Sequence, residues 1–413
     1  MKNGQVILEQ SKKYDSFYLY DESRILKNTT QLKCDFNTFE FFYSLKTNPA
    51  PAVAACVLAQ GFGADAASLA EVRLAHSLGV SADRIQYSAP GKSTADLNGA
   101  LGISTLIADS MGEVLRIQEI AESRGTVAEI GVRINPDFTF SGSGGVPSKF
   151  GVDEKQALAA ASEWNQLPNV RIVGIHVHSR SQELDAKVLE HYYQRMFHLT
   201  VVFQETFGHA LKFVNMGSGF GIPYSNQDQP LDTAYLGGRV AELTKQFREK
   251  LPGVRIIVET GRFAVCESGC YVTKVMDRKE SMGTTFVVLS NTLNGFIRPC
   301  IAQLIANYSN DDVPAASEPL YTGKDSFQIS VLTDEESETE TVTLVGNLCT
   351  ATDIVAKNVT LPKLKRGDVI VFSNAGSYSA VLSPMQFSSQ DAPAQLFLSR
   401  GGTVSDAAVN RNS

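Results

Sequence analysis

Short runs of apolar, β-branched and aromatic residues recur between residues 39 and 259, with amphipathic stretches between them. Eight runs predict strands, at residues 39–46, 62–68, 84–89, 105–109, 129–134, 171–178, 212–217 and 255–259. The segments between them, such as 69–78 and 111–123, space their apolar residues three and four apart, which predicts helices. Strand–helix alternation indicates parallel pairing, and eight units match an α/β fold of the (β/α)8 barrel type. A doubly wound sheet is the alternative.

The pattern changes after residue 265. Runs such as CYVTKVM, TTFVVLS and DVIVFSN resemble strands, and they alternate with turns rather than with helical periodicity. The early run SFYLYD (16–21) precedes the first barrel strand and is expected to join these later strands. We therefore predict a barrel over residues 26–265 and an all-β domain formed by residues 1–25 and 266–413.

Composition narrows the class of protein. Hydrophobic residues make up 43% and charged residues 20%, as in a globular chain. The formal net charge is −7, so electrostatics gives no reason to expect nucleic acid or an anionic membrane as partner. No apolar run reaches the ~20 residues of a membrane span, and the N-terminal residues lack a signal core, so a cytoplasmic protein is expected. The six cysteines have no zinc-ligand spacing, and we expect no metal site.

Polar and reactive residues follow six of the predicted strands. In a parallel barrel the C-terminal ends of the strands meet at one face, where active sites are built. The residues at these ends are Lys46; Asp65 and Ser68; Arg133 and Asn135; His176, His178, Arg180 and Ser181; Gly217, Gly219 and Gly221; and Glu259, Gly261 and Arg262. So many reactive side chains at one face predict an active site.

Three of these features together suggest pyridoxal phosphate. Lys46 at a barrel mouth is expected to be desolvated, which would lower its pKa and make it a nucleophile for an aldehyde. The glycine run MGSGFG (216–221) is expected to free backbone N–H groups for a phosphate, with Arg262 nearby. Glu259 supplies a charge for a ring nitrogen. A snorkelling surface lysine and a plain tight turn remain the simpler interpretations of single features.

A series of motifs then carries a family resemblance over nearly the whole chain. They are YSLKTNP, GFGADAASLAE, SKFGV, GIHVHSRSQ, NMGSGFGIPY, ETGR, GFIRP, GNLCTATD and SNAGSY, in this order. The chain resembles the fold-type III pyridoxal-phosphate-dependent decarboxylases of the ornithine, diaminopimelate and arginine group. The resemblance implies pyridoxal 5′-phosphate as cofactor, an alanine-racemase-like barrel, a small amino-acid substrate, and a homodimer whose two chains share each active site.

The resemblance also implies residue roles. Lys46 would bind the cofactor covalently, His178 would stack on its ring, and Glu259 would keep its ring nitrogen protonated. Cys349, from the partner subunit, would protonate the product carbon after carbon dioxide leaves. Cofactor contacts would include Asp65, Ser181, Gly217, Gly219, Gly221, Gly261, Arg262 and Tyr378. Substrate contacts would include Arg180, Arg298, Thr350 and, from the partner subunit, Asp353.

Two departures from the family pattern affect the expected substrate. Thr350 stands where diaminopimelate and ornithine enzymes carry an acidic residue, and Arg180 replaces a glycine after the stacking histidine. An added guanidinium suits a carboxylate-rich substrate, unless it pairs with a surface acid. We therefore expect a siderophore precursor of the citryl-diamino-acid type. The alternatives are diaminopimelate itself, an amino acid linked to a carrier protein, a non-catalytic homologue, or an alanine-type racemase.

Overall fold

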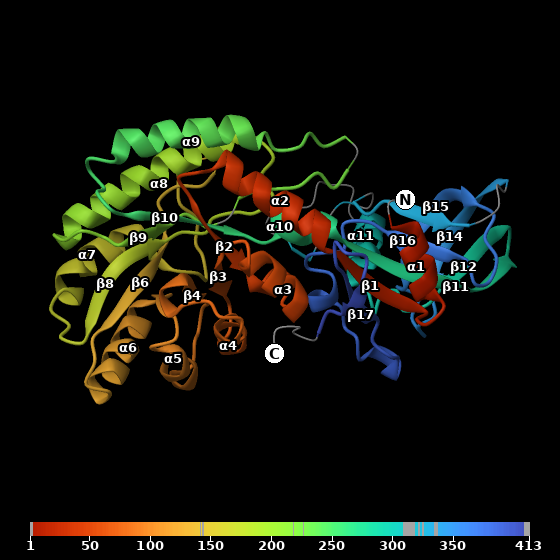
Figure 1. Cartoon of the computed structure of the whole chain (residues 1–413), viewed down its shortest axis with the longest axis horizontal. Coiled ribbons are helices and arrows are strands. Elements are labelled where there is room, and N and C mark those ends of the chain that lie inside the picture. The colour runs from red at the N-terminus through yellow and green to blue at the C-terminus, as the bar shows by residue number, and fades with distance from the viewer. Residues whose placement is uncertain are drawn as a thin grey trace.

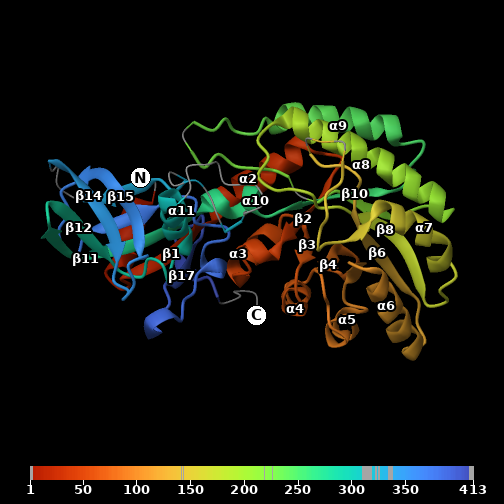
Figure 2. The same ribbon diagram turned by 180° about the vertical axis from the view of Figure 1, so that it is seen from behind.

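The computed structural model describes residues 3–408, apart from 141, 143, 218, 226, 309–318, 321, 322, 324, 325 and 334–337. A barrel and a β domain lie side by side along the long axis of the molecule, in the front view and from behind (Figures 1 and 2).

The barrel is a closed sheet, as the alternating pattern predicts. Among the described residues, eight parallel strands surround its axis: β2 (Glu40–Ser44), β3 (Gly63–Ala66), β4 (Ile85–Ser88), β5 (Thr105–Ala108), β6 (Ala128–Asn135), β8 (Val170–His176), β9 (Phe213–Asn215) and β10 (Arg255–Thr260). Pairing of β10 with β2 and of β5 with β6 closes the ring. Closure confirms the predicted barrel and rules out the open doubly wound sheet.

Helices cover the outside of the barrel. They are α2 (Glu22–Asp35), α3 (Pro51–Leu58), α4 (Leu69–Ser77), α5 (Thr94–Ala100), α6 (Met111–Ser123), α7 (Glu154–Trp164), α8 (Ala186–Phe207), α9 (Thr233–Phe247) and the short α10 (Arg262–Val265). Serine side chains accept hydrogen bonds from the first-turn amides of α4, α5 and α6, which fixes where these helices begin. The short strand β7 (Val152–Asp153) precedes α7.

Large apolar side chains fill the barrel interior. Phe42, Phe213 and Ile257 belong to a buried cluster inside the ring of strands. A Cβ atom at Gly174 would lie 2.5 Å from the Phe213 ring, so glycine on β8 makes room for that ring. The interior is therefore a packed core that supports the strand ends rather than a channel.

The second part is the expected, mostly β domain. Its strands are β1 (Ser16–Asp21), β11 (Gly269–Ser281), β12 (Thr284–Leu289), β13 (Ile329–Leu332), β14 (Thr339–Gly346), β15 (Ile354–Pro362), β16 (Val369–Phe372), β17 (Ala394–Leu398) and β18 (Val404–Asp406). Strand β1 pairs with β11 and β17, as predicted for the SFYLYD run. Two helices, α1 (Gly4–Ser11) and α11 (Ile297–Tyr308), were not predicted.

The β domain packs against the end of the barrel where the strands terminate. Strand β10 runs toward the β domain and continues through α10 into β11 (Figure 1). A loop of the β domain returns to the barrel, where the Tyr378 amide donates to the Thr47 carbonyl (2.9 Å) and the Asn48 side chain donates to the Gly376 carbonyl (2.9 Å). The site is thus assembled from both parts of the chain.

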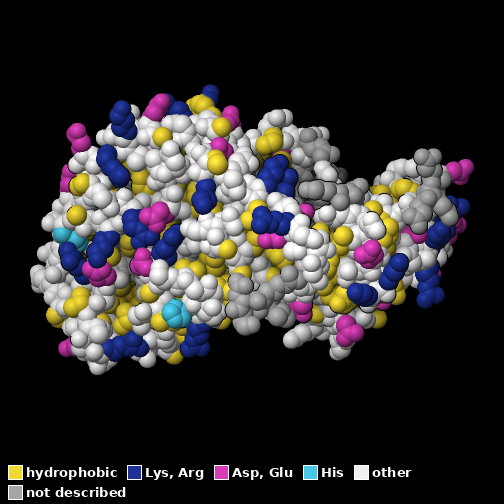
Figure 3. All heavy atoms as spheres, in the orientation of Figure 1, with side chains coloured by type: hydrophobic (Ala, Val, Ile, Leu, Met, Phe, Trp, Pro, Cys, Tyr) yellow, Lys and Arg dark blue, Asp and Glu magenta, His cyan; other side chains and the backbone are white. Residues whose placement is uncertain are grey.

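The surface of the barrel carries charges of both signs. On the face seen in Figure 3, basic and acidic side chains are interspersed among polar ones, as on an ordinary solvated surface. In the described part of the chain, no helix combines the length and the apolar character needed to cross a membrane.

Candidate active site

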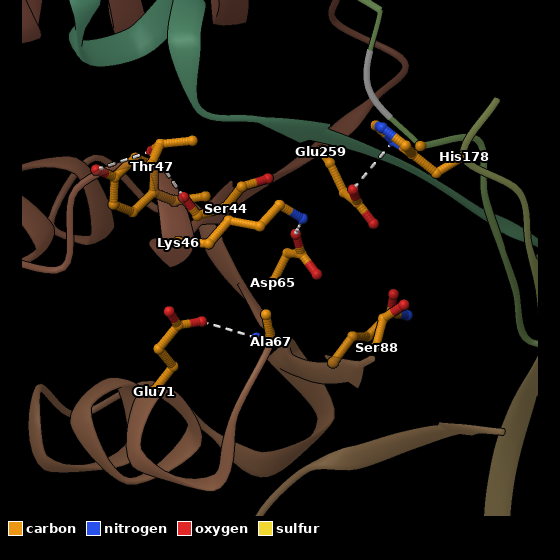
Figure 4. Close-up of polar contacts among 12 residues, drawn as sticks. Ser44, Lys46, Thr47, Asp65, Ala67, Glu71, Ser88, His178 and Glu259 are labelled. Carbon is orange, nitrogen blue, oxygen red and sulfur yellow. Dashed lines mark hydrogen bonds and ion pairs between the residues drawn. The ribbon is translucent and has the colours of Figure 1, made fainter. Parts of the chain in front are cut away.

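Lys46 lies at the barrel mouth, in a short 3₁₀ turn (Leu45–Thr47) that directly follows β2. Its ammonium nitrogen is 3.1 Å from Oδ2 of Asp65, which ends up beside it because β3 pairs with β2. Asp65 is 1% exposed, whereas 39% of the Lys46 side chain remains exposed. Figure 4 shows the ammonium directed at Asp65, with Glu259 and His178 on the far side of the site.

The predicted direction of the Lys46 pKa is wrong. Burial does lower this pKa, but the carboxylates of Asp65 and Glu259 outweigh burial and raise it above its ordinary value. Burial and the neighbouring Glu259 in turn raise the pKa of Asp65. The chain therefore holds Lys46 as a paired cation rather than as a ready nucleophile.

Glu259 ends β10 and is almost fully buried. Its Oε1 lies 2.9 Å from Nε2 of His176 and accepts a hydrogen bond from Asn215 (3.1 Å), while its Oε2 lies 3.6 Å from Nδ1 of His178. Burial raises the pKa of Glu259, but His176, Lys46 and His178 outweigh burial and hold it well below its usual range. Glu259 is therefore a buried carboxylate that stays ionised.

His178 follows β8 and faces the same space. Burial, only partly opposed by Glu259, lowers its pKa to about 3, so the ring is neutral near pH 7. Nε2 of the ring lies 3.3 Å from the Ser181 hydroxyl. A neutral, partly exposed imidazole (24% of its side chain) fits the predicted stacking role, which stays a prediction.

A pocket brings Lys46 together with the predicted phosphate-binding residues. Its lining consists of Ser44, Lys46, His178, Ser181, Phe220, Gly261, Arg262 and Tyr378. Arg262 is buried, and its guanidinium lies 5.1 Å from the centre of the Tyr378 ring. A Cβ atom at Gly261 would lie 2.2 Å from Thr47, so a larger residue would not fit there. The structure thus unites five of the predicted cofactor contacts besides Lys46.

Two amides of the glycine run bond within the chain rather than being free as predicted. The Gly217 amide donates to Oδ1 of Asn215 (2.8 Å), and the Gly221 amide donates to the Glu183 carbonyl (2.9 Å). Glycine is required at position 217 for a different reason. The backbone there has φ +71°, and a Cβ atom would lie 2.3 Å from the Val177 carbonyl oxygen. Gly219 similarly abuts Leu189, and residue 218 lies outside the described residues.

Arg298 lies beside Arg262, the arginine that is predicted to bind the phosphate. It is fully buried on α11, and its guanidinium donates to the Tyr224 hydroxyl (3.4 Å) and to the Ser377 carbonyl (3.3 Å). Arg262 donates to the same Tyr224 hydroxyl. One tyrosine therefore links the predicted cofactor arginine to the predicted substrate arginine. Substrate contact by Arg298 stays a prediction.

Arg180 pairs with a neighbouring acid. Its guanidinium lies 3.7 Å from Glu183, three residues further along, and 39% of its side chain is exposed. The pairing is the alternative left open by the sequence, and it lessens the positive charge that Arg180 could offer to a substrate.

The loop that carries Cys349 and Thr350 lies in the β domain, between β14 and β15. Cys349 is exposed and does not belong to the lining of the Lys46 pocket. The Asp353 carboxylate is buried and accepts hydrogen bonds from the Thr292 hydroxyl and from the amides of Leu293 (3.0 Å) and Leu348 (3.1 Å). These bonds use Asp353 to anchor its own loop, which is not the substrate contact that the resemblance implies.

Sequence reasoning assigned no role to four residues that organise the site, although it had placed His176 at a strand end. His176 and Asn215 hold Glu259, Ser88 contacts His176 (3.1 Å), and Tyr224 bridges the two arginines. His176, Asn215 and Tyr224 lie within the quoted motifs, so their positions offered a signal. Ser88 offered none, because its role depends on how β4 faces β8 across the barrel.

The residues present fit pyridoxal phosphate. The pocket offers a primary amine at Lys46 and a buried arginine, Arg262, with the hydroxyl groups of Ser181 and Tyr378. The buried, ionised carboxylate of Glu259 lies beside the pocket, 3.6 Å from His178 of the lining. One buried oxygen of Asp65 has no hydrogen-bond partner in the described structure. A ligand with an aldehyde, a phosphate and a basic ring nitrogen would satisfy these groups. Among the described residues, no group of three His, Cys, Asp or Glu side chains is placed to hold a metal ion.

Comparison with known proteins agrees with this chemistry. Residues 22–266 match the family described as "Pyridoxal-dependent decarboxylase, pyridoxal binding domain". The chain is 31% identical to an L-glutamyl-[BtrI acyl-carrier protein] decarboxylase of Niallia circulans, over 95% of this chain and 91% of that protein. It is 28% identical to a diaminopimelate decarboxylase of Zymomonas mobilis, over 83% and 76% of the two chains.

Solved structures give the same result. The diaminopimelate decarboxylase of Helicobacter pylori complexed with L-lysine superposes with a TM-score of 0.79 at 26% identity, covering 95% of this chain and 93% of that one. The site geometry and these relatives establish pyridoxal phosphate as the cofactor and carboxy-lyase chemistry as the activity. The chain belongs to the fold-type III pyridoxal-phosphate-dependent amino-acid decarboxylases.

Proposed function

We propose that the enzyme decarboxylates an amino acid whose side chain is joined to a carrier through an acyl link, rather than free diaminopimelate, ornithine or lysine. The substrate's α-carboxylate must stay free because it is the group that leaves. The carrier is therefore attached through the distal carboxyl group, as in a γ-glutamyl thioester.

The Cys349 loop is the observation that carries this proposal. A distal ammonium group needs a carboxylate partner when it is bound away from water. Position 350 is a threonine, and the Asp353 carboxylate already accepts hydrogen bonds from Thr292, Leu293 and Leu348. The loop therefore suits a neutral distal group, such as a thioester or an amide, better than a cationic one.

Similarity to a carrier-dependent enzyme supports the same substrate class. The Niallia circulans relative is named for an L-glutamyl group on an acyl-carrier protein, and it aligns with this chain over almost its full length. The siderophore-type substrate, which was expected from Arg180, has less support because that guanidinium lies 3.7 Å from Glu183. Diaminopimelate remains the other candidate, since several relatives are named for it.

The chain's own residues would divide the chemistry as follows. Pyridoxal phosphate, when bound, supplies an electron sink for the bond that releases carbon dioxide. Arg262, Ser181 and Tyr378 would hold its phosphate, and the ionised Glu259 would face its ring nitrogen. Lys46 would bind the aldehyde carbon and yield it to the substrate amine. Cys349 would deliver the proton to the product carbon.

We further propose that two copies share each site. Cys349 is exposed and lies outside the lining of the Lys46 pocket of its own chain, so a second copy is the natural source of the thiol.

Because the substrate is small at its reacting end, the carrier would stay outside the pocket.

The substrate is tested by steady-state kinetics with a γ-glutamyl thioester of pantetheine, meso-diaminopimelate, L-ornithine, L-lysine and a citryl-diamino acid. We expect the thioester to have the highest kcat/KM, with loss of carbon dioxide seen by mass spectrometry. Arg180→Ala should change its KM little, because Glu183 already pairs with that guanidinium. Efficient turnover of meso-diaminopimelate would contradict the proposal, and preference for the citryl compound would restore the siderophore interpretation.

A further inference from the structure

His176 is a buried histidine to which the family resemblance assigns no role. It ends β8, is 1% exposed, and does not belong to the lining of the Lys46 pocket. Nδ1 of its ring lies 3.1 Å from the Ser88 hydroxyl, and Nε2 lies 2.9 Å from Oε1 of Glu259. It therefore contacts the carboxylate without lining the pocket itself.

The contact with Glu259 is a close polar approach rather than an aligned hydrogen bond. Nε2 of His176 has no hydrogen-bond partner elsewhere in the described part of the chain. The Glu259 carboxylate is therefore what this nitrogen faces, with Asp65 as a second acidic neighbour. Placing a ring nitrogen against a carboxylate in a buried site stabilises the ionised form of that carboxylate.

The two carboxylate oxygens of Glu259 have different contacts. Oε1 is held by His176 and by Asn215, whose amide group also donates to Gln86 (2.7 Å). Oε2 lies on the side of His178, 3.6 Å from its Nδ1, and His178 lines the pocket. One oxygen is thus fixed inside the barrel while the other is turned toward the cofactor site.

We propose that His176 is a positioning residue, which keeps Glu259 ionised and oriented so that Oε2 meets the protonated ring nitrogen of pyridoxal phosphate. Ser88 assists by holding the other side of the imidazole ring. A buried carboxylate without such a partner takes up a proton and then cannot hold a positive ring nitrogen. The inference depends on the cofactor and is independent of which amino acid the enzyme decarboxylates.

The contact is tested first in the protein without cofactor. The chain has six histidines, so ¹⁵N-histidine labelling gives few ring signals, and His176→Gln identifies those of His176. We expect Glu259→Gln and Ser88→Ala each to move the His176 ring signals. The signals of His209, whose ring contacts the carbonyls of Phe207 and Ile172, should stay in place. Unmoved His176 signals in Glu259→Gln would overturn the proposal.

A second measurement follows the cofactor itself. His176→Phe removes the ring nitrogens, whereas His176→Gln keeps an N–H donor on a similar position. We expect His176→Phe to weaken pyridoxal phosphate binding by about 10-fold or more and to shift the ¹⁵N signal of the bound ring nitrogen toward its unprotonated value, with partial recovery in His176→Gln. Thermal unfolding checks that each variant is folded, and His209→Gln is the matched control. A folded His176→Phe variant with normal affinity and an unchanged ring-nitrogen signal would refute the positioning role.

Discussion

The ion pair between Lys46 and Asp65 should control how fast the free enzyme captures its cofactor. A neutral amine attacks an aldehyde, whereas an ammonium group does not. Because Asp65 and Glu259 raise the pKa of Lys46, little neutral amine is present near pH 7. Replacing Asp65 with asparagine removes the nearest negative charge, lowers that pKa and should therefore speed capture.

The size of the effect follows from the geometry. Two unit charges at about 4 Å attract each other by about 4 kcal/mol near a protein surface and by about 1 kcal/mol in water. The Lys46–Asp65 separation is 3.1 Å, but 39% of the lysine side chain is exposed, so we take ~2 kcal/mol after solvent screening. That energy is about 1.5 pKa units, or roughly 30-fold more neutral amine at any pH below the pKa of Lys46.

Stopped-flow absorbance after mixing the cofactor-free protein with pyridoxal phosphate measures the capture rate directly. In the unmodified chain the rate should rise with pH across the neutral range, because raising the pH deprotonates Lys46. Asp65→Asn should be about 30-fold faster near pH 7 and should reach its plateau at lower pH. Glu71→Gln is the matched control, since that carboxylate accepts from the Ala67 amide and does not pair with Lys46.

The reasoning fails if Asp65→Asn captures the cofactor at the original rate with the same pH dependence. It also fails if Glu71→Gln accelerates capture as much as Asp65→Asn does. Either result would mean that the Asp65 charge does not set the protonation of Lys46.

Three further predictions concern the substrate loop, the shared site and the fold. Thr350→Glu should raise kcat/KM for meso-diaminopimelate or ornithine by about 10-fold, because the new carboxylate can accept a charge-assisted hydrogen bond from the distal ammonium group. Unchanged kinetics would mean that residue 350 does not determine which substrate is used. Lys46→Ala and Cys349→Ala should each be inactive alone but recover activity when subunits exchange, as measured by carbon dioxide release; no recovery despite exchange would place both residues of a site on one chain. Gly217→Ala should lose at least about 2 kcal/mol of unfolding free energy, through its positive φ and the overlap with a neighbouring carbonyl, and a normal denaturant midpoint would contradict this.

The order of elements and the residues at the strand ends followed from the sequence. Alternating apolar runs and amphipathic stretches are local patterns, so they predicted all eight barrel strands and the strand β1 that joins the β domain. The pattern also put Lys46, His178 and Glu259 at one face, because parallel strands end together. The helix α11 was not predicted, because it is a single helix in a segment of strands and is not part of a repeating strand–helix alternation.

Tertiary structure decided what these side chains do to one another. Closing the barrel brings Asp65 against Lys46, so the lysine pKa rises although burial alone would lower it. It also places His176 beside Glu259, an arrangement that depends on the separation between two strands distant in sequence. Packing of the β domain fixes the Asp353 carboxylate between its own loop and the segment at Leu293. Sequence thus determined which groups reach the site, whereas burial and pairing, which depend on distances between non-neighbouring elements, determined their charge and their partners.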